Sequence, residues 1–173
     1  NMGAGNDILE ARSTYLPFAY GNLQAKIDMG SGDDIVKTSG TTDSPYSFYR
    51  EVSIDGGDYF DTLEFVNRDS KTIMTKISAI SNFEKIDIKG TLNNSVFISA
   101  SDVEKNHSAT ATVDASGKSH NNVLIVDGDA GDKVTLTGIS KAASSQVTYE
   151  GNTYNVYNTG SNELWVDSDI TIA

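Results

Sequence analysis

Three short segments rich in glycine and aspartate recur at one spacing, and they constrain the fold more than any other feature of the chain. They are 2–9 (MGAGNDIL), 29–36 (MGSGDDIV) and 56–63 (GGDYFDTL). Each has glycine second, aspartate sixth and a large aliphatic residue eighth, and successive copies begin 27 residues apart. This spacing is three times nine, and GGxGxDxU is the nonapeptide repeat of calcium-binding parallel β-rolls. We therefore predict a stack of similar turns in the first third of the chain.

The residue types in these turns suit a divalent cation. Glycine adopts backbone angles closed to other residues, which lets carbonyl oxygens turn toward an ion, and aspartate adds a short anionic oxygen. Calcium takes about six to eight oxygen ligands, so two stacked turns can share one ion. A cation would also offset the repulsion among Asp28, Asp33 and Asp34. One such turn alone would indicate an ordinary Asp–Gly turn, whereas three at equal spacing favour calcium.

The copies are not identical. Asp55 and Asp58 strengthen the third copy, but Tyr59 stands where the repeat expects glycine. In the first copy Asn6 stands where the second has Asp33. A fourth acidic stretch, 126–134 (VDGDAGDKV), offers Asp127, Asp129 and Asp132 as metal ligands, with an Asx-rich hairpin turn as the alternative.

The remaining sequence predicts an all-β domain. Short runs rich in Val, Ile, Thr and Tyr alternate with Gly, Asn, Asp and Ser. The runs are 61–66, 84–88, 94–99, 109–113, 122–126, 133–138, 146–157 and 163–172. We expect one domain, in which 1–65 forms the calcium turns with their inserts and 66–173 forms an antiparallel β-sandwich portion. Residues 150–153 (EGNT) predict a hairpin turn, and Ser101 and Glu104 predict a capping box for a short helix.

Composition excludes several classes of function. The net charge is −11, with 24 acidic and 13 basic residues, which argues against a nucleic-acid-binding face. The chain has no cysteine, so it holds no cysteine-ligated zinc, redox dithiol or cysteine nucleophile. No apolar run approaches the roughly 20 residues of a membrane helix. The N-terminal sequence NMGAGND is not a signal peptide, so we expect any export signal to lie outside this segment.

Two aromatic inserts separate the glycine–aspartate turns, at 11–22 and 39–50. Tyrosine and serine supply contact area and adaptable hydrogen bonds, which suits a surface that binds a ligand. We expect Phe18 and Phe48 to cap the core. The candidate ligand-binding residues are Arg12, Tyr15, Tyr20, Tyr46, Ser47, Tyr49 and Arg50.

Together with the segments 82–90, 96–103, 126–138 and 153–170, the turns resemble the C-terminal region of giant RTX adhesins of Gram-negative bacteria. More narrowly, nearly the whole chain resembles their calcium-dependent peptide-binding domain. The resemblance implies a calcium-rich β-sandwich with RTX-like β-roll turns, secreted by a type I system to the bacterial cell surface. It implies several calcium ions, one of which receives the C-terminal carboxylate of a partner protein in adhesion or biofilm formation. The matching motif assigns calcium binding to Asp7, Asp34 and Asp61. The additional candidate ligands are Asp28, Asp33, Asp55 and Asp58.

Three other classes of function bear on the same sequence features. An enzyme is disfavoured, because the chain lacks HExxH, GxSxG and P-loop motifs, and we expect His107 and His120 to be solvated. A calcium-dependent carbohydrate-binding module is the main alternative, since calcium lectins also combine an open ion with aromatic side chains. A purely structural calcium module is the third possibility.

Overall fold

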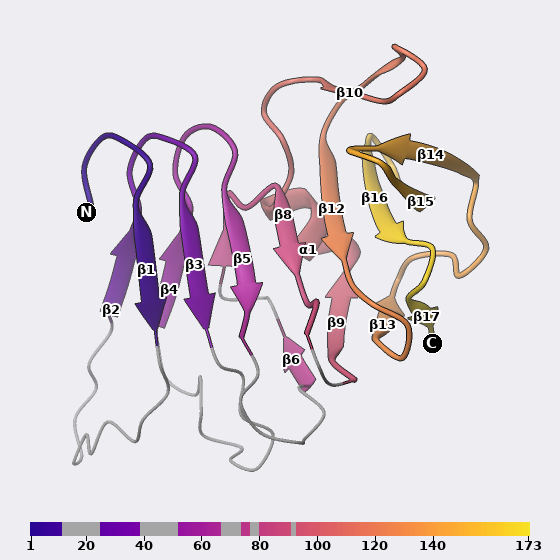
Figure 1. Ribbon diagram of the computed structural model, residues 1–173, viewed down its shortest axis with the longest axis horizontal. Coiled ribbons are helices and arrows are strands. Elements are labelled where there is room, and N and C mark those ends of the chain that lie inside the picture. Colours follow the sequence, from indigo (N-terminus) through magenta and orange to yellow (C-terminus); the bar gives the residue numbers. More distant parts are fainter. Residues whose placement is uncertain (12–24, 39–51, 67–73, 77–79, 91–92) are drawn as a thin grey trace.

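Strands dominate the architecture, which confirms the all-β prediction (Figure 1). The computed structural model describes residues 1–11, 25–38, 52–66, 74–76, 80–90 and 93–173. The only helix in these ranges is the six-residue α1 (Ala100–Lys105). No helix in this part of the chain has the length and apolar character needed to cross a membrane.

The largest sheet has eight strands in the order β1-β3-β5-β8-β12-β16-β15-β14. The strands from β1 to β16 are parallel to one another, and β15 and β14 are antiparallel to their neighbours. Their bounds are β1 (Ile8–Ala11), β3 (Ile35–Thr38), β5 (Thr62–Phe65), β8 (Lys85–Asp87), β12 (Val123–Asp127), β16 (Asn162–Asp167), β15 (Asn152–Thr159) and β14 (Ser145–Tyr149).

Two smaller parallel sheets carry the intervening strands. One has the order β2-β4-β7 and the other β17-β13-β9-β6. Their strands are β2 (Ala25–Asp28), β4 (Val52–Asp55), β7 (Ile80–Ser81), β6 (Met74–Lys76), β9 (Ser95–Ser99), β13 (Lys133–Thr137) and β17 (Thr171–Ile172). A separate antiparallel pair joins β10 (Thr112–Val113) to β11 (Ser119–His120).

The chain alternates between the eight-stranded sheet and the smaller ones, so it winds in stacked coils. In the first coils the register advances by one repeat: Ile8 pairs with Ile35, and Ile35 pairs with Thr62. Alternate residues of β3 and β5 are buried, as expected for strands with one face on a core. The main core cluster contains Val36, Leu63 and Ile86 together with side chains of the smaller sheets.

The strand pairing after residue 66 differs from the predicted antiparallel portion. Strands β8, β9, β12 and β13 all pair in parallel, and among the described residues antiparallel pairing is limited to β14–β15–β16 and β10–β11. The reason is the connection: β8 and β12 each lead across to a smaller sheet, so neighbouring strands of one sheet run the same way. Alternation of apolar and polar residues is typical of antiparallel sheets. The parallel strands β9 and β13 nevertheless alternate in burial.

Two local predictions fare differently. The hairpin at 150–153 is confirmed, with Glu150 (φ 49°) and Gly151 (φ 86°) as the two turn residues. The helix is present, but its capping box is not Ser101 with Glu104. Ser99 is the N-cap, and its side chain and backbone exchange hydrogen bonds with Asp102.

Candidate metal centre

Glycine is required in the repeated turns because neighbouring coils touch there. Gly30 has φ of 108°, and a Cβ on it would lie 2.0 Å from the Gly3 carbonyl oxygen. Gly57 stands in the same relation to Gly30, also at 2.0 Å. Backbone hydrogen bonds cross the same contacts, since the Ser31 amide donates to the Gly3 oxygen at 2.9 Å and the Asp58 amide to the Gly30 oxygen at 2.9 Å. The repeated glycines therefore stack coil on coil, as their spacing predicts.

The sixth-position aspartates form a continuous row at the start of the strands of the large sheet. The Asp7 amide donates to Asp34 Oδ1 at 2.7 Å, and the Asp34 amide donates to Asp61 Oδ1 at 2.8 Å. The row continues to Glu84, whose Oε2 accepts the Asp61 amide at 2.6 Å. We call Asp7, Asp34, Asp61 and Glu84 the carboxylate ladder. The motif predicts its first three members, but the interval shortens from 27 to 23 residues before Glu84, which sequence reasoning missed.

The second oxygen of each ladder aspartate lacks a partner. Asp7 Oδ2, Asp34 Oδ2 and Asp61 Oδ2 are buried and accept no hydrogen bond. Asp34 and Asp61 have no exposed surface at all. Within the described ranges, no Lys, Arg or His forms an ion pair with a member of the ladder. Buried carboxylates without a counter-charge are costly, so this row calls for a proton or a cation.

Burial makes two members of the carboxylate ladder, Asp61 and Glu84, weaker acids. It raises the pKa of Asp61 to about 7, with the neighbouring carboxylates of Asp34, Asp33 and Asp55 acting in the same direction. Burial also raises the pKa of Glu84 to about 7, aided by the charge of Asp61. Hydrogen bonds from backbone amides oppose both shifts but do not cancel them. The ladder residues therefore fit a cation site, because an added positive charge would stabilise oxygens that are otherwise hard to ionise.

The helper aspartates are more exposed than Asp34 and Asp61. Asp28, Asp55 and Asp58 line an open groove of about 420 Å³ over the turns, together with Asn1, Ser31 and Asn82. Two donors already contact Asp55: Asn82 Nδ2 at 2.7 Å and Lys26 Nζ at 3.3 Å. Asp33 is exposed, and its Oδ1 accepts the Phe60 amide at 3.1 Å.

The predicted ligands therefore divide into a buried row and an open groove. Across the described ranges, no three acidic or histidine side chains converge on one point that could hold an ion. A cation at the ladder would have to lie between neighbouring coils and complete its shell with other oxygens.

The acidic stretch at 127–132 is occupied by protein donors. Asp127 pairs with Lys85 Nζ at 2.5 Å and Lys89 Nζ at 3.3 Å, and it also accepts the Tyr154 hydroxyl. Asp132 accepts the amides of Asn94 and Asp129, one on each oxygen. These contacts favour the Asx-rich turn over the metal site, although the turn joins β12 to β13 in another sheet and is not a hairpin.

This stretch belongs to a second row of carboxylates that the sequence analysis missed. Asp87 pairs in register with Asp127, and Asp167 lies beside Asp127 at the end of β16. The three recur every 40 residues, within IDIK, VDGD and VDSD, which is the signal that could have found them. Lys85 and Lys89 supply the counter-charge here, and they hold the pKa of Asp127 below its usual value against the effect of burial.

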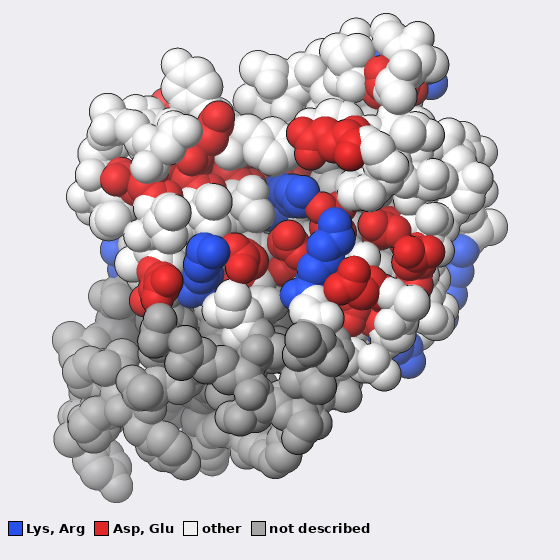
Figure 2. Space-filling model, in the orientation of Figure 1, with Lys and Arg blue, Asp and Glu red and all other residues white. Residues whose placement is uncertain are grey.

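The two rows of carboxylates thus differ in how their negative charge is compensated. Acidic side chains near the turns above β1 and β3 have no basic side chain among them in Figure 2, whereas basic side chains lie between acidic ones over the centre of that face. In the second row Lys85 and Lys89 pair with Asp127, whereas no basic side chain pairs with the carboxylate ladder in the described part of the chain.

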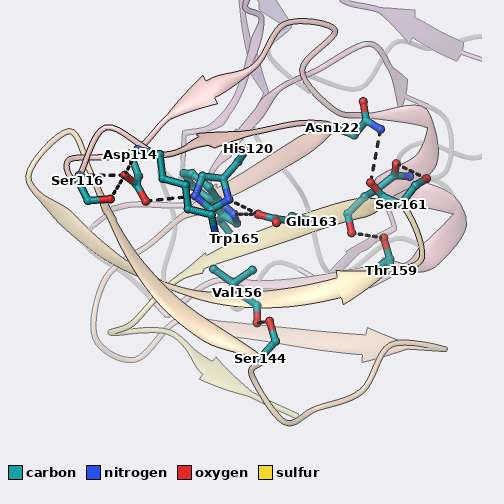
Figure 3. Close-up of polar contacts among 12 residues, drawn as sticks. Asp114, Ser116, His120, Asn122, Ser144, Val156, Thr159, Ser161, Glu163 and Trp165 are labelled. Carbon is teal, nitrogen blue, oxygen red and sulfur yellow. Dashed lines mark hydrogen bonds and ion pairs between the residues drawn. The ribbon is translucent and has the colours of Figure 1, made fainter.

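His120 is not solvated as expected. It is 4% exposed, and its Nδ1 lies 2.9 Å from Glu163 Oε2 and its Nε2 3.2 Å from Asp114 Oδ2 (Figure 3). The Trp165 indole N–H donates to the same Glu163 oxygen at 2.8 Å. These contacts tie the β10–β11 pair to β16. They are cross-links inside the fold, with each carboxylate matched to donors.

The predicted ligand-binding residues Arg12, Tyr15, Tyr20, Tyr46, Ser47, Tyr49 and Arg50 lie outside the described residues. So do Phe18 and Phe48. Tyr59, which departs from the repeat, keeps the glycine-like φ of 90° and is 73% exposed.

Comparison of the chain with protein-family models, with curated proteins and with solved structures finds no match.

Proposed function

We propose that this chain is a calcium-dependent adhesion module of a secreted bacterial surface protein, and that it binds the C-terminal end of a partner protein. One observation supports the calcium part above the others. Three neighbouring coils each hold a buried aspartate oxygen without a partner, and no described basic side chain compensates them.

In this proposal Asp7, Asp34, Asp61 and Glu84 hold calcium between coils. Calcium supplies positive charge that lets these carboxylates ionise together, and its binding energy adds to the free energy of folding. The groove lined by Asp28, Asp55 and Asp58 offers further oxygen ligands near the surface. Extracellular calcium modules typically bind with dissociation constants of about 10⁻⁴ to 10⁻³ M. Such a module would fold fully only after export, where calcium is abundant.

The peptide part rests on the aromatic inserts and on the resemblance to RTX adhesin domains. A calcium ion with an open coordination position would accept the terminal carboxylate, and Arg12 and Arg50 would favour an anionic ligand. The tyrosines and Ser47 of the inserts would contact the peptide. Binding, not catalysis, is the proposed activity.

A binding assay separates this proposal from its rivals. Immobilised peptides with a free C-terminal carboxylate are expected to retain the protein in calcium and release it in chelator, while the same peptides with an amidated C-terminus do not retain it. Tyr46→Ala and Tyr49→Ala should weaken retention about tenfold or more, as for aromatic side chains that dominate an interface. Retention that simple sugars abolish would instead favour the carbohydrate-binding module. Retention unaffected by both tyrosine changes would remove the inserts from the binding site.

A further inference from the structure

The turn between β7 and β8 brings a backbone oxygen close to an oxygen of the carboxylate ladder. The contact forms at Gly56, which stands where the first two copies of the repeat have Met2 and Met29. A Cβ on Gly56 would lie 2.0 Å from the Asn82 carbonyl oxygen and 2.8 Å from Asp61 Oδ2. Both oxygens therefore lie within 2.8 Å of one point beside the Gly56 backbone.

Neither of these two oxygens has a described hydrogen-bond partner. Asp61 has no exposed surface, and its Oδ2 accepts no hydrogen bond. The Asn82 carbonyl accepts none from any described donor. The carbonyl oxygens of Gly3 and Gly30, which approach the next coils equally closely, each accept an amide from that coil. Two unpaired acceptors beside one another are costly to bury, so the arrangement calls for a group that both can bind.

Asn82 is held in a conformation that fixes the direction of its carbonyl. Its φ of 57° is left-handed, which asparagine adopts more readily than most residues. Its amide donates to the Lys105 oxygen at 2.9 Å, and its side-chain Nδ2 donates to Asp55 Oδ1 at 2.7 Å. These contacts hold Asn82 against α1 and the end of β4, so the carbonyl is oriented before any ligand binds.

The surrounding charge favours a cation at this point. Asp61 and Glu84 are 0% and 3% exposed, and Glu84 Oε2 accepts the Asp61 amide at 2.6 Å. Among the described residues, no Lys, Arg or His pairs with either carboxylate. Carboxylates and backbone carbonyls are the ligands that calcium takes in proteins, at about 2.3–2.6 Å. The residue types therefore suit a hard divalent cation.

We propose that Asp61 Oδ2, the Asn82 carbonyl and the Glu84 carboxylate, together called the third-turn site, bind one calcium ion of their own. This inference rests on the proposed function and deepens it, because two of the three ligands lie outside the glycine–aspartate repeat. The site uses two carboxylates and one backbone oxygen, so it does not need the cluster of three acidic or histidine side chains that the described residues lack. Asn82 also lines the open groove, so water can complete the coordination shell.

Gly56→Ala in the full chain tests the third-turn site, because the added methyl group would lie against both oxygens. The φ of Gly56 lies outside the left-handed region, so the change adds no strain of that kind. Equilibrium dialysis should show one bound calcium ion fewer than in the native chain. Hydrogen exchange locates the loss: calcium should slow exchange of the Asp61 and Glu84 amides about tenfold or more in the native chain but not in the variant. The Asp7 amide should stay protected by calcium in both.

Glu84→Gln is the second variant, and it decides the question if Gly56→Ala fails to fold. A glutamine oxygen can still accept the Asp61 amide, so only the ligand charge is lost. We expect one calcium ion to bind about tenfold or more weakly, while the other ions are unaffected. Gly90→Ala is the matched control, because its Cβ would meet only Asn94 Nδ2, at 3.6 Å, and it should bind calcium as the native chain does.

The outcomes separate this inference from the proposed function. If the native chain binds calcium and both variants bind as many ions with the same affinity, the third-turn site is overturned, while calcium at Asp7 and Asp34 still stands. If the native chain binds no calcium, both proposals are overturned.

Discussion

At the scale of single residues, the contrast between Asp34 and Asp127 explains most of the electrostatics. Both are buried at the ends of parallel strands, at 0% and 1% exposure. Asp127 has two lysines and a tyrosine hydroxyl around it, and Asp34 has one backbone amide and an oxygen without a partner. A buried charge is stable only with a counter-charge and hydrogen bonds, so the proposed cation acts at Asp34 as Lys85 and Lys89 act at Asp127.

Asp34→Asn should change stability in opposite directions with and without calcium. An asparagine Oδ1 can still accept the Asp7 amide, so the backbone contact survives. In chelator, loss of one negative charge relieves repulsion, and the variant should be at least as stable as the native protein. In calcium, loss of a ligand should lower the free energy of unfolding by about 1–3 kcal/mol. Urea unfolding in both buffers measures the effect, with exposed Asp169→Asn as the control. A variant that is equally destabilised in both buffers would contradict a cation at this position.

The metal-free protein should lose stability as pH rises. Asp61 and Glu84 have folded-state pKa values of about 7, above their ordinary values of 3.8 and 4.5. A raised pKa means that the folded state holds the proton more tightly, so this contribution is complete below about pH 4 and is lost as pH rises to about 7. Urea unfolding in chelator between these limits should show the decline, and the double change Asp61→Asn with Glu84→Gln should flatten it. A native profile that rises over this window would contradict the assignment.

At the scale of elements, the turn between two sheets is the repeating unit, and glycine sets how closely the units stack. In the third coil Gly56 has the same role toward the next turn, since its Cβ would lie 2.0 Å from the Asn82 carbonyl oxygen. Tyr59 takes the position of Gly32 in the third coil with a φ of 90°, and its side chain is 73% exposed.

Gly32→Ala should be far more damaging than Gly138→Ala. A Cβ at residue 32 would lie 2.4 Å from the Gly5 oxygen, in addition to the strain of a φ of 135°. Gly138 also has a positive φ, 71°, but open space around it. We expect a loss of about 1 kcal/mol for Gly138→Ala and about 3 kcal/mol or more for Gly32→Ala. Chemical denaturation of both variants in calcium tests this, and equal losses would show that coil contact adds nothing to backbone strain.

The sequence predicts some contacts of the fold and not others, and the difference has physical causes. The 27-residue spacing predicts the register of Asp7, Asp34 and Asp61 because a stack of equal coils must bring equal positions together. Glu84 was missed because one coil is shorter, and the 40-residue recurrence that joins Asp127 to Asp87 and Asp167 was missed because the flanking residues differ. The burial of His120 was also missed, because its partners Asp114 and Glu163 come from other elements. Parallel pairing after residue 66 was missed because β9 and β13 alternate as antiparallel strands do, although β12 is buried at every position, as is typical of parallel strands.

At the scale of the whole molecule, the parallel strands of the large sheet lie side by side (Figure 1), and the two carboxylate rows lie at their opposite ends. The carboxylate ladder precedes β1, β3, β5 and β8, and the lysine-compensated row ends β8, β12 and β16. β8 belongs to both, with Glu84 before it and Asp87 at its end. The protein therefore joins a row in which two lysines pair with the central carboxylate, Asp127, to a ladder that would depend on an external cation. Calcium would be expected to order the first coils far more than the rest.

Equilibrium dialysis against calcium, from about 10⁻⁵ to 10⁻² M, tests the central claim most directly. It is applied to the native chain, to the triple change Asp7→Asn, Asp34→Asn and Asp61→Asn, and to a control with Asp129→Asn and Asp169→Asn. The native chain and the control should bind calcium with the same stoichiometry, and the triple variant should bind at least one ion fewer. A native chain that binds no calcium, or a triple variant that binds as many ions as the native chain, would contradict the account.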